Sequence, residues 1–152
     1  MTIRIELQNT LSGPDLPDQQ DFQRWVHAIP SQSEQEVLIR IVDTQEMLAL
    51  NHQFRQQERA TNVLSFPAEL PEVVELPLLG DVIICAPIVQ QEANEQGKCV
   101  LSHWAHMTVH GILHLLGYDH TEENEAQTME QLETDILCTL GFANPYIDNT
   151  HN

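Results

Sequence analysis

Hydrophobic and polar positions alternate at the start of the chain and later recur at helical spacing. Residues 3–7 alternate strictly, which predicts a strand. After a loop that contains proline and glycine, the apolar side chains of residues 22–29 are three and four apart, which predicts a helix. The run EVLIRIVD at residues 36–43 predicts a second strand. The chain is therefore expected to begin as strand, helix, strand.

A second helix and two more strands are predicted in the middle of the chain. Asp43 with Glu46 resembles a capping pair at the start of a helix that ends near the polar stretch 51–60. A third strand is expected at residues 61–66. A fourth, LLGDVIIC, is expected at residues 78–85, after a proline-rich, acidic loop.

Three helices are expected to complete the chain. Pro87 suits the first turn of one helix, which a glycine ends. Ser102 can cap the next, which runs to about Leu116 and is apolar enough to lie in the core. Thr121 can cap the last, whose apolar residues repeat at three and four until Gly141. The acidic residues of this last helix are most simply interpreted as a solvated face.

This order of elements, without internal repeats, predicts one α+β domain over residues 1–152: a small mixed four-stranded sheet packed against about five helices. The composition, 41% hydrophobic and 19% charged, is that of a globular chain. The start of the sequence resembles no secretory signal, and no run approaches the roughly 18 apolar residues of a membrane span. We therefore expect a cytoplasmic protein without a membrane partner.

The chain is strongly acidic, and its few basic residues are unevenly placed. Six basic against 23 acidic residues give a net charge of −17, which repels polyanions at long range and argues against a general coat of nucleic acid. All six basic residues precede residue 99, so an anionic substrate must meet a small focused patch. Arg55 and Arg59 are the densest basic pair, and a functional role weighs about equally with a solvated loop.

The candidate chemistry lies in the run HGILHLLGYDH, which holds His110, His114 and His120. Residues four apart on a helix share a face, so the first two histidines can offer nitrogens to one ion. Gly117 can take the left-handed conformation that ends a helix, and the following turn can bring His120 beneath the same ion. The spacing therefore predicts a metal site with three histidine ligands.

Zinc fits this set of ligands, and the stoichiometry is that of a catalytic site. Zinc takes about four ligands, so three histidines leave one position for water or substrate. Structural zinc sites usually add cysteine, but the three cysteines of this chain form no CxxC pair. Nitrogen ligands also accept nickel, cobalt or copper. His103 and His106 share the helix, and we expect them to cap, pack or face solvent because neither has a turn that converges on the ion.

The sequence resembles the YbeY family of bacterial metal-dependent endoribonucleases. The resemblance rests on HGILHLLGYDH, TNVLSFP and LLGDVIIC, with VDTQEM and HWAHM as further matches, and spans nearly the whole chain. It implies a zinc ion held by His110, His114 and His120, and a role for Arg55 in the cleft. It also implies cleavage of single-stranded RNA, processing of the 16S rRNA 3′ end in the small subunit, and ribosome quality control.

The same spacing resembles that of the metzincin proteases, HExxHxxGxxH, and departs from it at one position. Gly111 stands where those proteases have the glutamate that acts as general base. We therefore rank a metalloprotease-like hydrolase below a nuclease. Asp119 beside the third histidine can orient an imidazole, but a turn aspartate is equally a simple helix-stop residue.

For RNA cleavage we expect zinc to activate a water or to polarise a phosphoryl oxygen, while Arg55 steadies the developing charge of the phosphate. The acidity of the chain implies weak intrinsic RNA affinity, so delivery by a ribosomal protein or a GTPase partner, as in the family, is physically sensible. The alternative from another class is a non-catalytic ribosome assembly factor. In that case zinc stabilises the fold and the acidic surface contacts basic ribosomal proteins.

Overall fold

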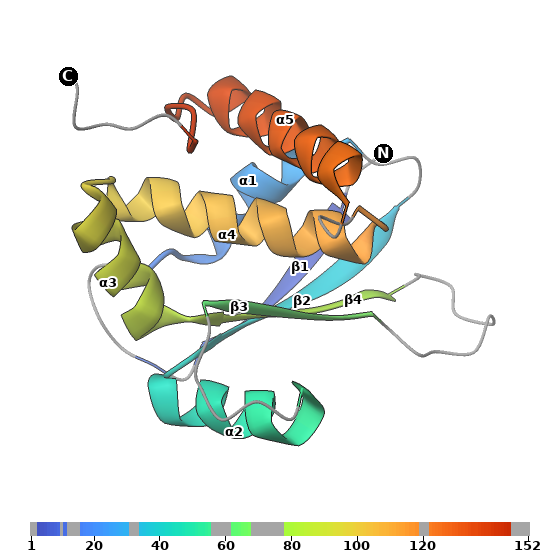
Figure 1. The fold of residues 1–152 in the computed structure, drawn as a ribbon. Coiled ribbons are helices and arrows are strands. Elements are labelled where there is room, and N and C mark those ends of the chain that lie inside the picture. Colours follow the sequence, from blue (N-terminus) through green and yellow to red (C-terminus); the bar gives the residue numbers. More distant parts are fainter. Residues whose placement is uncertain are drawn as a thin grey trace.

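The computed structural model describes residues 3–9, 11, 16–30, 34–55, 62–67, 78–118 and 122–146, with only the backbone at positions 54, 55 and 78. Within these ranges the strands and helices follow in the predicted order (Figure 1). They are β1 (Ile3–Asn9), α1 (Gln19–His27), β2 (Gln35–Val42), α2 (Thr44–Arg55), β3 (Val63–Pro67), β4 (Leu78–Cys85), α3 (Ala86–Gln96), α4 (Val100–Leu115) and α5 (Glu123–Thr139).

The sheet is mixed and has four strands, as predicted, in the order β1-β2-β4-β3. β2 pairs in parallel with both β1 and β4, while β3 runs antiparallel to β4. The two parallel pairs require connections that cross over the sheet, and these connections contain α1 and α2. The short strand β3 is left at one edge, beside α4.

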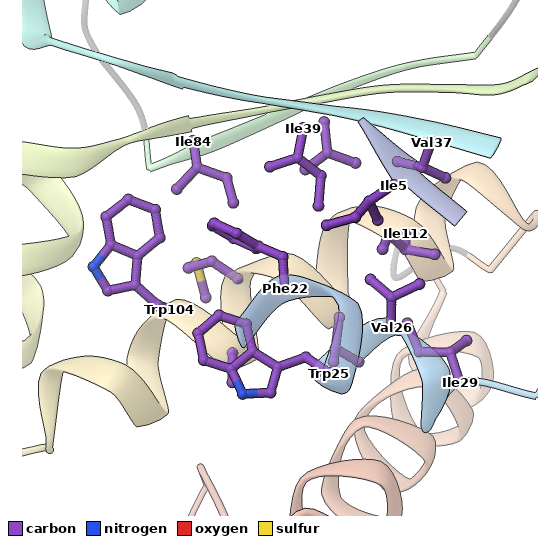
Figure 2. Packing of buried hydrophobic residues seen from close by; sticks show 14 of the residues in the cluster. Ile5, Phe22, Trp25, Val26, Ile29, Val37, Ile39, Ile84, Trp104 and Ile112 are labelled. Carbon is purple, nitrogen blue, oxygen red and sulfur yellow. The ribbon is translucent and has the colours of Figure 1, made fainter. Parts of the chain in front are cut away.

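Helices cover the two faces of the sheet unequally (Figure 1). α1 and α4 lie on one face with α5 packed on α4, whereas α2 lies on the other face. The larger core fills the first face, where the rings of Phe22 and Trp25 meet edge to face at 5.3 Å and Trp104 joins them (Figure 2). Burying each such side chain contributes roughly 1.5–3 kcal/mol. None of the helices in the described ranges is both long and apolar enough to cross a membrane.

The helix N-termini differ in part from the prediction. The backbone N–H of Glu46 donates to Asp43 Oδ1 at 2.8 Å, which confirms the aspartate as a cap, while the Glu46 carboxylate pairs with Arg40 at 2.9 Å. The prediction of Ser102 as a cap was wrong, because α4 already begins after Cys99. The chain turns from α3 almost directly into α4 and leaves no extended segment before Ser102. The N-cap of α5 is Glu122, and Thr121 lies outside the described residues.

Candidate metal centre

The two histidines of the predicted site that the structure describes lie one turn apart on α4. The ring centroids of His110 and His114 are 4.8 Å apart, and the ring planes cross at 81°. Residues 103–109 are all buried, whereas His110 and His114 are half-buried. The buried helix therefore opens toward the surface where the two rings face each other, and both can contribute to one site.

A glycine turn follows the second histidine. Gly117 has a φ of +105°, its N–H donates to the carbonyl of His114 at 3.1 Å, and the N–H of Tyr118 donates to Leu113 at 3.0 Å. This is the hydrogen-bond pattern of a glycine C-cap, in which a left-handed residue ends the helix. The prediction that Gly117 ends the helix is confirmed. His120, the predicted third ligand, and Asp119 lie outside the described residues.

Gly111, between the two histidines, is needed where α4 contacts the sheet. The hydroxyl of Ser65 on β3 donates to the carbonyl of Gly111 at 2.9 Å. A Cβ atom at Gly111 would lie 2.7 Å from Cγ1 of Val82, closer than side chains pack. The backbone position is thus too tight for a side chain. Packing against the sheet gives an independent reason why the glutamate of the metzincin pattern is absent.

A glutamate from α5 reaches the histidines of α4, which the sequence interpretation missed. Glu133 is only 1% exposed, so the expectation that the acidic residues of this helix form a solvated face was wrong for this residue. Its Oε1 lies 2.6 Å from Nε2 of His106, and its Oε2 lies 3.2 Å from Nδ1 of His110. The hydroxyl of Tyr146 donates to Oε1 at 2.9 Å. One carboxylate therefore joins three side chains.

The sequence carries a signal for the burial of Glu133. This residue is four positions after Met129 and four before Leu137, and both of these are buried. Residues four apart on a helix share a face, so Glu133 interrupts the apolar stripe of α5. A charged residue within such a stripe is expected to be paired, because an unpaired buried charge is strongly destabilising.

The electrostatics of this cluster favour an ionised Glu133. Burial alone raises the pKa of the carboxyl group, but the hydrogen bonds from His106 and His110 and the charges of these rings outweigh it and lower the pKa to about 2. Burial also raises the pKa of Tyr146, and the negative charge of Glu133 raises it further. Glu133 is therefore an acceptor, and the Tyr146 hydroxyl remains a donor at neutral pH.

His103 belongs to a separate contact nearer the start of α4. Its Nε2 lies 2.9 Å from Oε1 of Glu92 on α3, and the side-chain amide of Asn62 donates to the same oxygen at 3.1 Å. Burial lowers the pKa of His103, and the Glu92 carboxylate opposes that shift. Both His103 and His106 pack in the interior, which was one of the three expectations for them beside capping and facing solvent. Both rings also pair with a carboxylate.

The structure describes only the backbone of Arg55, so it does not test whether the guanidinium reaches the histidines. Arg55 is the last residue of α2, and that helix lies on the face of the sheet opposite α4 (Figure 1). Its side chain, like the whole of Arg59, lies outside the described residues. The role of Arg55 in the cleft stays a prediction.

The side chains of His110 and His114, the two predicted ligands that the structure describes, fit a zinc ion. Neutral imidazole nitrogen is a common zinc ligand, and zinc-bound histidines usually donate their other ring N–H to a carboxylate or a carbonyl. His110 has that partner in Glu133, and this contact uses Nδ1, the ring nitrogen nearer the backbone. No group of three potential ligands converges within the described ranges, which contain two of the three predicted ligands.

The fold and this centre define a class: an α+β domain whose central helix carries a histidine pair and ends at a glycine turn. Within that class, the profile of the family described as "Endoribonuclease YbeY" matches residues 7–141, and the chain belongs to this family. Membership implies an endoribonuclease, so the substrate class is RNA. The resemblance of the sequence to this family is thus confirmed.

The fold is similar to that of a solved structure from Thermotoga maritima. The solution structure of TM1509 from Thermotoga maritima matches with a TM-score of 0.50 and 24% sequence identity. The match covers 95% of this chain and 99% of that chain. The arrangement of the helices and the sheet is thus shared over almost the whole length of both proteins.

Proposed function

We propose that this protein is a zinc-dependent endoribonuclease that cleaves single-stranded RNA in the maturation of the 16S rRNA 3′ end and acts in ribosome quality control. Membership of the YbeY family supports the RNA substrate. The observation that carries the metal dependence is the contact between the His110 and His114 rings, with Nδ1 of His110 held by Glu133.

The residues have distinct roles in this proposal. His110, His114 and His120 hold the zinc ion. When bound, a zinc ion supplies a Lewis acid for a phosphoryl oxygen or a water of lowered pKa. Glu133 keeps the ring hydrogen of His110 on Nδ1. Arg55 binds the phosphate group and stabilises its negative charge.

The charge of the chain bears on how it meets RNA. A net charge of −17 repels a polyanion at long range, and the basic residues that could offset it are few. We propose that a basic ribosomal protein or a GTPase partner brings the enzyme to the small-subunit rRNA in the cytoplasm. Binding of isolated RNA is then weak, because few basic residues can replace the counterions of the phosphates.

The direct test is His114→Ala, with His27→Ala as the control because His27 is an exposed histidine on α1. We expect His114→Ala to abolish cleavage of a single-stranded RNA and the binding of zinc, while its thermal unfolding barely moves. His27→Ala should cleave like the wild type. A collapse of stability in His114→Ala, together with a wild type that cleaves no RNA, would instead support a structural zinc in an assembly factor.

Arg55→Ala tests the phosphate contact separately, with Arg24→Ala as the control because Arg24 is exposed on α1. We expect Arg55→Ala to slow cleavage about 100-fold, which is the scale of removing one donor that stabilises a developing charge. Zinc binding should be unchanged. Undiminished cleavage would remove Arg55 from the mechanism.

A further inference from the structure

His106, His110 and His114 follow one another on α4 at intervals of one turn. The first two contact Glu133 through different ring nitrogens. His106 meets the carboxylate through Nε2, at 2.6 Å, whereas His110 meets it through Nδ1, at 3.2 Å. Nε2 is the ring nitrogen farther from the backbone. His106 therefore directs its outer nitrogen at Glu133, and His110 does not.

The charge of the carboxylate determines where each ring carries its hydrogen. A glutamate at neutral pH is ionised, and its oxygens then only accept hydrogen bonds. A neutral His110 ring that bonds Glu133 through Nδ1 must carry its hydrogen there, so its lone pair is on Nε2. A neutral His106 ring is the reverse, with its lone pair on Nδ1. That atom is buried and has no hydrogen-bond partner among the described residues.

From this contrast we infer that Glu133 is a positioning residue that selects the metal ligands of α4. It presents Nε2 of His110 to the ion and holds His106 away from it. The inference deepens the metal site proposed above and rests on it. His106 and His110 share one face of the helix at the spacing typical of a ligand pair. In this inference, the contact with Glu133 is the reason why His110 binds the metal and His106 does not.

The surroundings of Glu133 suit this role. The side chain is 1% exposed, and the hydroxyl of Tyr146 supplies a third donor at 2.9 Å, so the carboxylate is held from several sides. A carboxylate that is fixed in this way fixes the rings bonded to it. Residues that hydrogen-bond a metal ligand in this way typically contribute 10- to 100-fold to metal affinity.

The test compares zinc affinity in two matched variants, measured by competition with a chromophoric chelator on the full chain. Glu133→Gln keeps the shape of the side chain but lets the amide both donate and accept, and we expect zinc binding to weaken 10- to 100-fold. Glu92→Gln makes the same change in the His103 contact on the same helix, and its zinc affinity should equal that of the wild type. Equal affinity in Glu133→Gln and the wild type would overturn the inference.

A second readout needs no substitution. In the metal-free wild type, at a pH at which ring-nitrogen NMR itself shows both rings to be neutral, the hydrogen of His110 should lie on Nδ1 and that of His106 on Nε2. The opposite tautomer at His110 would overturn the role of Glu133 even if zinc binds. A wild type with the expected tautomers that binds no zinc would overturn the proposed metal site, and ligand selection would fall with it.

Discussion

Glu133 and Glu92 both hold histidines of α4, but they do so in different surroundings. Glu133 is 1% exposed and joins His106, His110 and Tyr146. The Glu92 side chain is 28% exposed and joins His103 to Asn62 near the start of β3. The first contact includes a predicted metal ligand, whereas the second ties α3, α4 and the β3 edge together.

The difference shows that a histidine–carboxylate pair has two uses in this fold. Where water reaches the carboxylate, the pair is a modest structural link, since solvent can replace a lost partner. Where the carboxylate is buried, water cannot take its place, so more is lost when it is removed. Because Glu133 is buried, we expect its removal to lower both the free energy of unfolding and the affinity for zinc.

The largest effect on stability is expected for Glu133→Ala. The change leaves the ring N–H groups of the buried His106 and the half-buried His110 without their acceptor, and a buried group without a partner costs about 1–3 kcal/mol. We expect the free energy of unfolding, measured with urea at neutral pH, to fall by roughly 3 kcal/mol. If the free energy of unfolding falls no further than in Glu92→Ala, burial does not distinguish the two contacts.

The acid sensitivity of the wild type should be the next largest effect. The pKa of Glu133 is lowered from 4.5 to about 2 in the folded protein, so its contribution to stability is fully present above pH 4.5 and is lost as the pH falls toward 2. Between pH 5 and pH 3 this loss should be roughly 2 kcal/mol. The measurement is the difference between the wild type and Glu133→Gln across that range.

Glu133→Gln cannot titrate, so the difference isolates the one carboxyl group from the other acidic residues. If the wild type and Glu133→Gln lose stability in parallel between pH 5 and pH 3, Glu133 is not held ionised by the histidines.

Glu92→Ala should cost less than either. The carboxylate is partly exposed, and water can take its place beside His103. We expect the free energy of unfolding to fall by about 1 kcal/mol, with unchanged zinc affinity. A change in zinc affinity would contradict the separation of the two contacts.

The smallest effect is expected for Tyr146→Phe. The residue is 47% exposed, and its ring remains in place when only the hydroxyl is removed. We expect a loss of about 0.5 kcal/mol in urea unfolding, the low end for one hydrogen bond. A loss as large as that of Glu133→Ala would make Tyr146, instead of the two histidines, the main partner of the carboxylate.

The order of the elements could be predicted because each segment shows its own period. Alternation marks residues 3–7, and spacings of three and four mark the last helix, so neither needs knowledge of the tertiary packing. The helix starts were less certain. Ser102 has the side chain of a cap, but the tight turn between α3 and α4 decides where the helix begins.

The candidate site was predictable only where its residues are close in sequence. His110, His114 and Gly117 lie within one helix and its turn, so spacing alone relates them. Glu133 is 23 residues from His110, and the contact depends on how α5 packs on α4. The position of Glu133 in an apolar stripe was the available signal. It indicates burial, but it does not name the partner.

The most direct measurement of the central claim is the titration of zinc into the wild type with all histidine ring nitrogens observed by NMR. The account predicts one zinc ion per chain and large shifts at Nε2 of His110 and at the ring of His114, with His103 and His106 unchanged. A response at His106 together with a silent His110, or no binding at all, would contradict it.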